Sequence, residues 1–184
     1  MFRRTCLQSA IAVALLAVPT NIQAQQMGTM SDSDYLAKVA NAAPASVVKG
    51  ATIIQAQKDG TMRTLQTGTN GFTCMVAGAD DAMCADGNAM EWARAWMTHS
   101  APPDKVGFVY MLAGDNGASN TDPYATAPAA DNHWVKTGPH VMIVGATSKT
   151  MGYPTTPDAD PTKPYVMWAG TPYAHVMIPV SGQP

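Results

Sequence analysis

Apolar and polar residues alternate along most of this chain, in short segments separated by turn-forming residues. Because side chains of an extended strand point to opposite faces in turn, a period of two predicts strands with one buried face. The strands predicted in this way cover residues 47–57, 61–67, 71–76, 106–113, 134–136, 139–145, 165–169 and 173–180. A Lys58-Asp59-Gly60 turn joins the first two strands as a hairpin.

Two segments carry helical signals instead. Ser31 followed by Asp34 is typical of a helix start, which predicts a short helix at residues 35–41 that Pro44 terminates. The second helix is predicted from Asn88, a favourable N-cap with Glu91 three residues later as in a capping box, to the Pro102-Pro103 pair.

The second helix has two apolar faces. Met90, Ala93 and Met97 recur on one face, and Trp92 and Trp96 lie four residues apart on the adjoining face. This much apolar area indicates that the helix packs against a sheet, so that its Met and Trp residues belong to the core.

The element pattern favours a mainly β fold of the α+β kind. We expect an antiparallel β-sandwich or barrel with one or two short helices. Long irregular connections are expected at residues 114–131 and 147–164, which are crowded with Gly, Pro, Asn, Asp and Thr.

The first 24 residues are typical of a secretory signal peptide. A basic start at Arg3 and Arg4 precedes a short apolar core and a plausible cleavage site before Gln25. We therefore expect residues 25–184 to form a single secreted, β-rich domain in the periplasm or outside the cell. No later apolar run is long enough to span a membrane.

Charge and cysteine content narrow the possible partners and compartment. Residues 25–184 contain nine basic and thirteen acidic residues, a net charge of −4, which disfavours nucleic acids and anionic membrane surfaces as partners. Cys74 and Cys84 are the two cysteines after the leader, and an oxidising compartment predicts a disulfide between them. Their spacing is not that of a CxxC redox or zinc motif.

The tetrapeptide His-Val-Met-Ile occurs twice, at residues 140–143 and 175–178. In a strand, His140 and Met142 point to one face, and His175 and Met177 do the same in the second copy. Imidazole and thioether together suit copper, and a Met ligand does not need a reducing environment. The predicted metal ligands are His140, Met142, His175 and Met177, with Met151 from the intervening loop.

These spacings resemble the copper motif of the PCu(A)C-type periplasmic copper chaperones. Ten residues separate His140 from Met151, and twenty-three separate Met151 from His175, two more than in that family. Gly-Phe-Val-Tyr-Met at residues 107–111 is similar to the strand that precedes the motif. The resemblance covers residues 106–180 and implies a cupredoxin-like β-sandwich and Cu(I) as the bound ion.

The whole chain after residue 24 is also similar to a family of secreted proteobacterial proteins. The shared segments are Asn-Gly-Phe-Thr-Cys-Met at residues 70–75, Ala-Ser-Asn-Thr-Asp-Pro-Tyr at 118–124 and Gly-Pro-His-Val-Met at 138–142. This resemblance implies secretion and a single domain, and it implies no activity.

Two function classes are compatible with these sequence features. In the first, the protein is a small periplasmic Cu(I)-binding protein; in the second, it is a metal-free structural or ligand-binding protein of the envelope. Copper ligands should cluster near a surface, whereas the same residues in a purely structural role should be sealed in the core. The common hydrolase signatures and the Gly-rich phosphate loop are missing from the sequence, so a non-enzymatic role is favoured.

Overall fold

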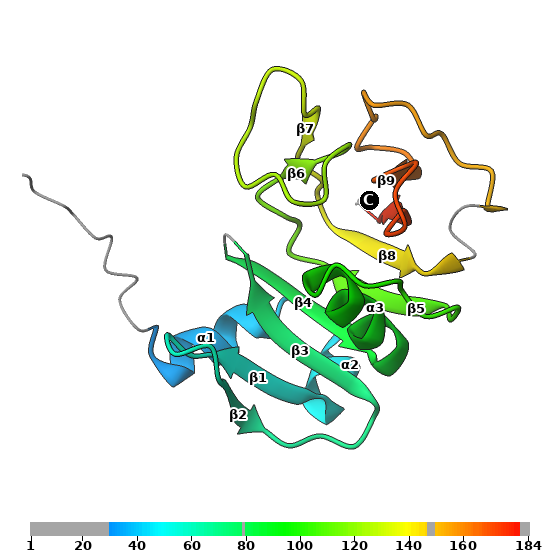
Figure 1. The fold of residues 1–184 in the computed structure, drawn as a ribbon. Coiled ribbons are helices and arrows are strands. Elements are labelled where there is room, and N and C mark those ends of the chain that lie inside the picture. The colour runs from blue at the N-terminus through cyan, green and yellow to red at the C-terminus, as the bar shows by residue number, and fades with distance from the viewer. Residues whose placement is uncertain (1–29, 79, 147–149, 181–184) are drawn as a thin grey trace, which may run out of the picture.

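The computed structural model describes residues 30–78, 80–146 and 150–180. An eight-stranded sheet forms its centre, with strand order β2-β1-β3-β4-β5-β8-β10-β9 (Figure 1). These strands are β1 (Thr52–Ala56), β2 (Met62–Gln66), β3 (Phe72–Ala77), β4 (Asp81–Asp86), β5 (Gly107–Met111), β8 (His140–Val144), β9 (Tyr165–Met167) and β10 (His175–Pro179). A second sheet pairs β6 (Ala118–Ser119) with β7 (Trp134–Val135).

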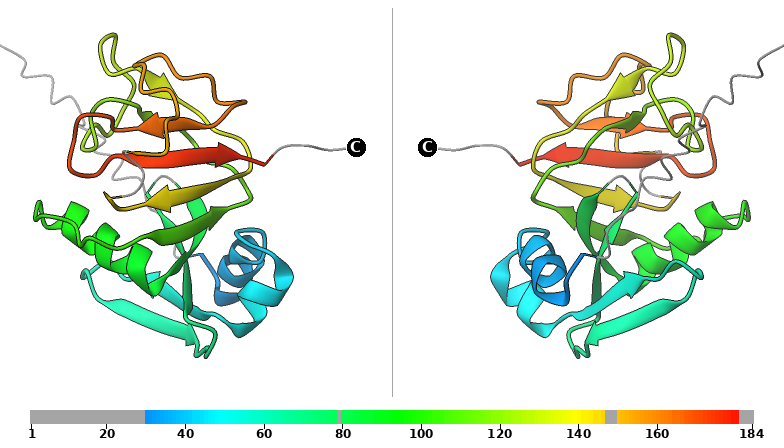
Figure 2. Two further views of the ribbon diagram at one scale, coloured as in Figure 1. Left: turned by 90° about the vertical axis from the view of Figure 1, so that its right-hand side faces the viewer. Right: turned by 90° about the vertical axis from the view of Figure 1, so that its left-hand side faces the viewer.

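The mainly β, α+β class is confirmed, with differences in detail. The large sheet is open, so the barrel form is not adopted. It is also mixed, because β1 runs parallel to β3 while the other adjacent strands pair antiparallel. Three helices are present among the described residues, where one or two were expected: α1 (Asp32–Val39), α2 (Ala45–Gly50) and α3 (Gly87–Met97). Helices cover both sheet faces, as Figure 2 shows for α3 on one side and α1 with α2 on the other.

Helix α3 packs against the sheet through Ala89, Trp92 and Ala95, which are all buried. The prediction that Met97 lies on the buried face was wrong, since this side chain is 63% exposed. The two Trp residues decide which way the helix faces, because large aromatic surfaces gain most from burial. A close approach to β5 is possible only because Gly107 has no side chain; a Cβ there would lie 2.4 Å from the Ala89 nitrogen.

The start of α3 also differs from the prediction. Asp86, at the end of β4, is the N-cap, and its side chain accepts a hydrogen bond of 2.8 Å from the Ala89 N–H. Asn88 instead donates to the Val106 carbonyl, and Glu91 pairs with Lys105 at 2.7 Å. A capping box therefore does not form, because the helix starts two residues earlier than Asn88 would place it.

Helices α1 and α2 cover the other face over β1, β3 and β4. The predicted N-cap Ser31 is confirmed, since its hydroxyl accepts from the Asp34 N–H. The prediction of a strand from residue 47 was wrong at its start, because Ala45–Gly50 is helical and follows Pro44 as N-cap. Proline has a fixed φ that suits the beginning of a helix, so Pro44 starts α2.

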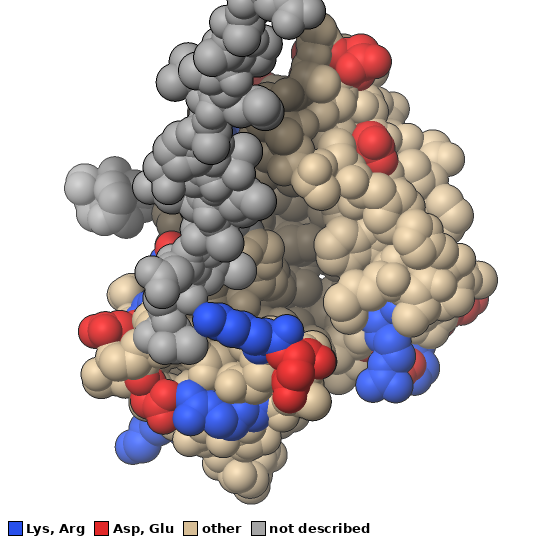
Figure 3. Space-filling model, turned by 60° about the vertical axis from the view of Figure 1, so that its left-hand side comes forward, with Lys and Arg blue, Asp and Glu red and all other residues tan. Residues whose placement is uncertain are grey.

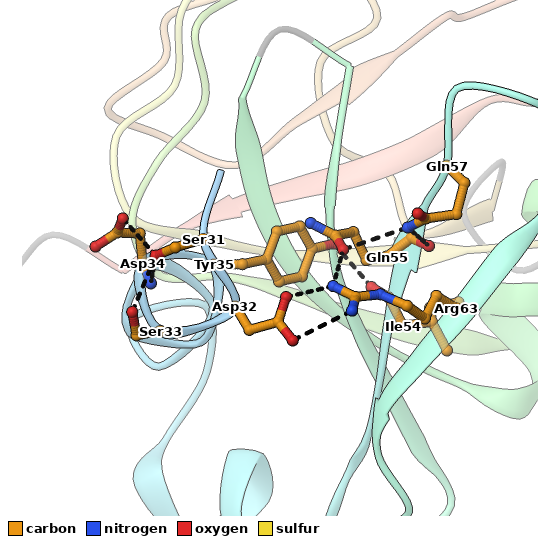
Figure 4. A network of polar contacts seen from close by, with 9 residues as sticks. All are labelled: Ser31, Asp32, Ser33, Asp34, Tyr35, Ile54, Gln55, Gln57 and Arg63. Carbon is orange, nitrogen blue, oxygen red and sulfur yellow. Dashed lines mark hydrogen bonds and ion pairs between the residues drawn. The ribbon is translucent and has the colours of Figure 1, made fainter. Parts of the chain in front are cut away.

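Polar contacts fasten α1 to the sheet (Figure 4). Tyr35 is buried, and its hydroxyl donates a hydrogen bond of 2.7 Å to the Ile54 carbonyl. The hydroxyl oxygen also accepts a hydrogen bond of 2.9 Å from the Val76 N–H. Nearer the surface, Arg63 of β2 pairs with Asp32 of α1. Tyr35 thus links α1 to β1 and β3 together, which fixes the helix across two neighbouring strands.

The predicted disulfide between Cys74 and Cys84 is confirmed. The two residues lie directly opposite each other on β3 and β4. Strand β4 was not expected, because its sequence Asp-Ala-Met-Cys-Ala-Asp is a short apolar run between two acidic residues, which is also typical of a connection. The bond therefore joins the two strands of a hairpin within the sheet.

Charged side chains are unevenly spread over the face drawn in Figure 3. Lysines, arginines and acidic residues lie next to one another below a hollow in the surface, and the rest of the view is mostly uncharged. Within the described residues, no helix is long and apolar enough to cross a membrane. The predicted signal peptide, residues 1–24, lies outside the described part of the chain.

Candidate functional site

The two His-Val-Met-Ile segments form the adjacent strands β8 and β10. Their antiparallel register places Met142 directly opposite Met177 and His140 opposite Pro179. Residues two apart on a strand share a face, so His140, Met142, His175 and Met177 all lie on one face of the sheet. We call this the α3 face, since α3 covers part of it. The structure therefore brings these four predicted residues onto a common face.

The two imidazoles nevertheless stand at opposite ends of this strand pair. His175 lies four positions before Pro179, the residue opposite His140. At about 3.3 Å per residue, the two positions are offset by roughly 13 Å along the strands. The methionine pair Met142 and Met177 occupies the middle of this interval.

Each imidazole is anchored in the same way. The Nδ1 atom of His140 lies 2.7 Å from the Gly138 carbonyl oxygen, and that of His175 lies 3.0 Å from the Tyr173 oxygen. A carbonyl can only accept, so Nδ1 carries the proton in both rings and Nε2 of the neutral ring carries the lone pair. This arrangement is common among metal-binding histidines, whose second nitrogen donates to a carbonyl or carboxylate.

The two anchors lie far apart on the strand pair. Each bonded carbonyl belongs to the residue two positions earlier, so each anchor lies at the N-terminal end of its own strand. Because the strands are antiparallel, these ends lie on opposite sides of the Met142–Met177 pair. The two anchoring carbonyls therefore lie at opposite ends of the strand pair, and the charge of His140 still acts on His175.

The end of the site at His140 is polar. Its Nε2 atom is buried and has no hydrogen-bond partner. Burial lowers the pKa of His140, although the Gly138 carbonyl and the Asp115 carboxylate act in the opposite direction. Nearby, the Thr137 hydroxyl lies 2.7 Å from the Tyr165 hydroxyl. A neutral imidazole thus presents an unused lone pair inside the protein.

Asp115 lies close enough to His140 for the two charges to influence each other. Burial raises the pKa of Asp115, while hydrogen bonds from the Thr137 and Gly117 N–H groups and the charge of His140 lower it. Those two N–H groups donate to one carboxylate oxygen at 2.9 and 3.0 Å. Asp115 therefore supplies negative charge at the His140 end.

The end of the site at His175 is aromatic. The rings of Trp92 and Trp168 stand nearly perpendicular to the imidazole, with centroids 5.3 and 4.8 Å away. Burial, with a smaller contribution from the charge of His140, lowers the pKa of His175 to about 4, although the bond to the Tyr173 carbonyl acts in the opposite direction. Trp168 adopts a φ of 56°, which is rare for a bulky residue and is consistent with a constrained position.

Two methionines that were not predicted as ligands adjoin the histidines. Met111 of β5 lies directly opposite His140, and Met167 of β9 lies directly opposite His175. Both are buried, and cross-strand neighbours of this kind have Cβ atoms about 4.5–5.5 Å apart. A signal was present, because each of these strands ends in Met and precedes one His-Val-Met-Ile segment.

The predicted donors differ in exposure. His140, His175 and Met177 are sealed, at 0%, 1% and 2% exposure, whereas Met142 is partly exposed. Met151 is 38% exposed, and Tyr153, two residues later, packs against the opposite face of the sheet. Met151 is therefore the most exposed of the predicted donors.

A second cluster surrounds His133, the neighbour of Trp134 in the sequence. His133 Nδ1 lies 2.8 Å from the Asp158 carboxylate, beside a recess of about 300 Å³ that Lys136 and Pro157 also line. His99 is a further imidazole outside the α3 face, and it stacks on Tyr124 at 4.2 Å. His133 and His99 are thus each engaged by another side chain.

Comparison with known proteins does not assign a function to this site. No protein-family model, curated protein or solved structure matches the chain. In the described ranges, no three His, Cys, Asp or Glu side chains come together as a metal site would require. Any metal on the α3 face would therefore depend on methionine thioethers, which favour soft ions.

Proposed function

We propose that this protein binds Cu(I) on the α3 face, through His140 and neighbouring thioethers. The observation that carries the proposal is the buried Nε2 atom of His140, which has no partner. Leaving a buried acceptor unpaired costs about 1–3 kcal/mol, and a bound ion removes that cost. Orphaned polar atoms of this kind call for an explanation such as an ion or an ordered water.

The surrounding side chains suit this ion. Met111 is the cross-strand neighbour of His140, and Met142 follows two residues later on the same face. One imidazole and two thioethers make a soft donor set that favours Cu(I) over zinc. The carboxylate of Asp115 offsets the charge of the ion, and partly exposed Met142 provides its route inward.

The alternative is a metal-free structural or ligand-binding protein of the envelope. The complete burial of both imidazoles favours it, because sealed side chains are what a packing role requires. The two functions differ in one respect: a packing role leaves the His140 lone pair unused, whereas copper binding uses it. Under either function, the disulfide and the predicted leader support a periplasmic or extracellular location.

An anaerobic competition titration against a chromogenic Cu(I) chelator tests the proposal. We expect wild type to withdraw copper from the chelator and Met111→Leu to bind at least about tenfold more weakly, the lower limit for losing even an outer-shell partner. Leucine nearly conserves the volume of methionine, so packing is kept. Met62→Leu, at a 51% exposed position on β2, is the matched control and should bind like wild type. If wild type withdraws no copper from the chelator, the Cu(I) proposal is overturned and the metal-free function stands.

A further inference from the structure

The surroundings of the two histidines repeat each other around the Met142–Met177 pair. A local twofold axis through this pair and perpendicular to the sheet exchanges β8 with β10 and His140 with His175. The same axis exchanges β5 with β9 and therefore Met111 with Met167. Each histidine thus has one methionine two residues along its strand and one directly across on the outer strand.

We propose that the α3 face holds two Cu(I) half-sites, the second formed by His175, Met167 and Met177. This inference rests on the proposed Cu(I) binding and extends it from one ion to two. The register offsets the two histidine positions by roughly 13 Å along the strands, a distance that a single shared ion would have to span. Each histidine instead has two methionine neighbours of its own.

The two half-sites have matching donors but different surroundings. At the first, Asp115 supplies negative charge beside His140. At the second, Trp92 and Trp168 surround His175. An ion bound at His175 would therefore be surrounded by aromatic groups, whereas one bound at His140 would lie beside a carboxylate.

This difference allows the ions to be distinguished. Copper in the second half-site lies beside Trp92 and Trp168 and should quench tryptophan fluorescence more strongly than copper in the first. A Cu(I) titration of the protein should therefore show two bound equivalents, one of which quenches more strongly than the other. Met111→Leu should weaken binding of the weakly quenching equivalent at least about tenfold, and Met167→Leu should weaken binding of the strongly quenching equivalent by the same factor.

The outcomes separate this inference from the proposed function. If no copper is bound, both fail. One bound equivalent that Met111→Leu weakens overturns the second half-site and leaves the proposed function intact. One bound equivalent that only Met167→Leu weakens overturns the proposed function as well. Should a leucine variant fail to fold, the stoichiometry and fluorescence of wild type still decide, because they distinguish two equivalents from one. Met62→Leu again serves as control and should retain both equivalents.

Discussion

At the scale of single residues, His175 couples folding to pH. Its pKa is lowered to about 4 by burial, from an ordinary value of 6.5. Below pH 6.5 the unfolded chain takes up a proton that the folded protein refuses, so stability is lost as the pH falls from 6.5 toward 4. A shift of this size corresponds to roughly 3 kcal/mol. We expect urea unfolding midpoints to decrease over this range.

The contribution of His175 can be isolated by substitution. His175→Phe keeps a buried ring without a titrating group, so its midpoint should change less between pH 6.5 and 4 than that of wild type. His99→Asn, at an exposed position, is the control and should follow wild type. Asp115, with a raised pKa, contributes with the opposite sign in both proteins and cancels in the comparison. An equal decrease in His175→Phe and wild type would contradict this account.

The lowered pKa of His140 also affects the proposed copper binding. The neutral imidazole is the form that binds metal, and burial keeps His140 neutral below its usual range. Cu(I) affinity should therefore stay nearly constant from pH 7.5 to 6.5 and decrease only at lower pH. Titrations at several pH values would show this, and a decrease centred on pH 6.5 would mean that the bound imidazole is solvated.

At the scale of elements, the contact between α3 and β5 depends on Gly107. A Cβ at this position would lie 2.4 Å from the Ala89 nitrogen and 2.7 Å from its Cα. Gly107→Ala should push the helix from the strand and destabilise the protein by about 1–3 kcal/mol or more, as overpacking does. Gly87→Ala is the matched control, since nothing lies within 4 Å of its Cβ. Equal unfolding midpoints for the two variants would contradict the close approach.

The N-terminus of α3 offers a second test. Asp86 accepts from the Ala89 N–H, so Asp86→Ala should cost about 1 kcal/mol through loss of the cap. Glu91 makes only an exposed ion pair with Lys105, and Glu91→Ala should cost less than about 0.5 kcal/mol. Urea denaturation resolves this difference. The reverse order would restore the capping role that the sequence suggested for Glu91.

At the scale of the whole molecule, the disulfide stabilises the sheet. The bond joins Cys74 and Cys84, which are ten residues apart in sequence. In the chain-entropy model, closing a loop of this length stabilises the folded protein by roughly 2 to 3 kcal/mol. The Cys74→Ala/Cys84→Ala double variant should unfold at a correspondingly lower urea concentration. Intact-mass measurement of the purified protein should find neither cysteine alkylated without reductant. Alkylation of both would place the protein in a reducing compartment.

How far the sequence predicted the structure depended on the range of the interactions. Alternation over two residues located most strands, since strand periodicity is a local property. Met97 was wrongly expected in the core although Trp92 was correctly placed there, because both are apolar and only the packed sheet decides which of them is buried. Strand β4 was not predicted because its central residues are covered on both faces of the sheet, so its sequence does not alternate between apolar and polar residues. Which strands pair, and their order in the sheet, could not be predicted from a local pattern.

For the candidate site, the sequence by itself determined the donor types and their shared face. His140 with Met142 and His175 with Met177 must each share a face once their segments are strands, because the side-chain period is two. Strand register alone decided that Met142 meets Met177, that the imidazoles lie at opposite ends, and that Met111 and Met167 adjoin them. Burial, the unpaired Nε2 atom and the lowered pKa values also arise from packing. They depend on residues distant in the chain, which periodicity cannot specify.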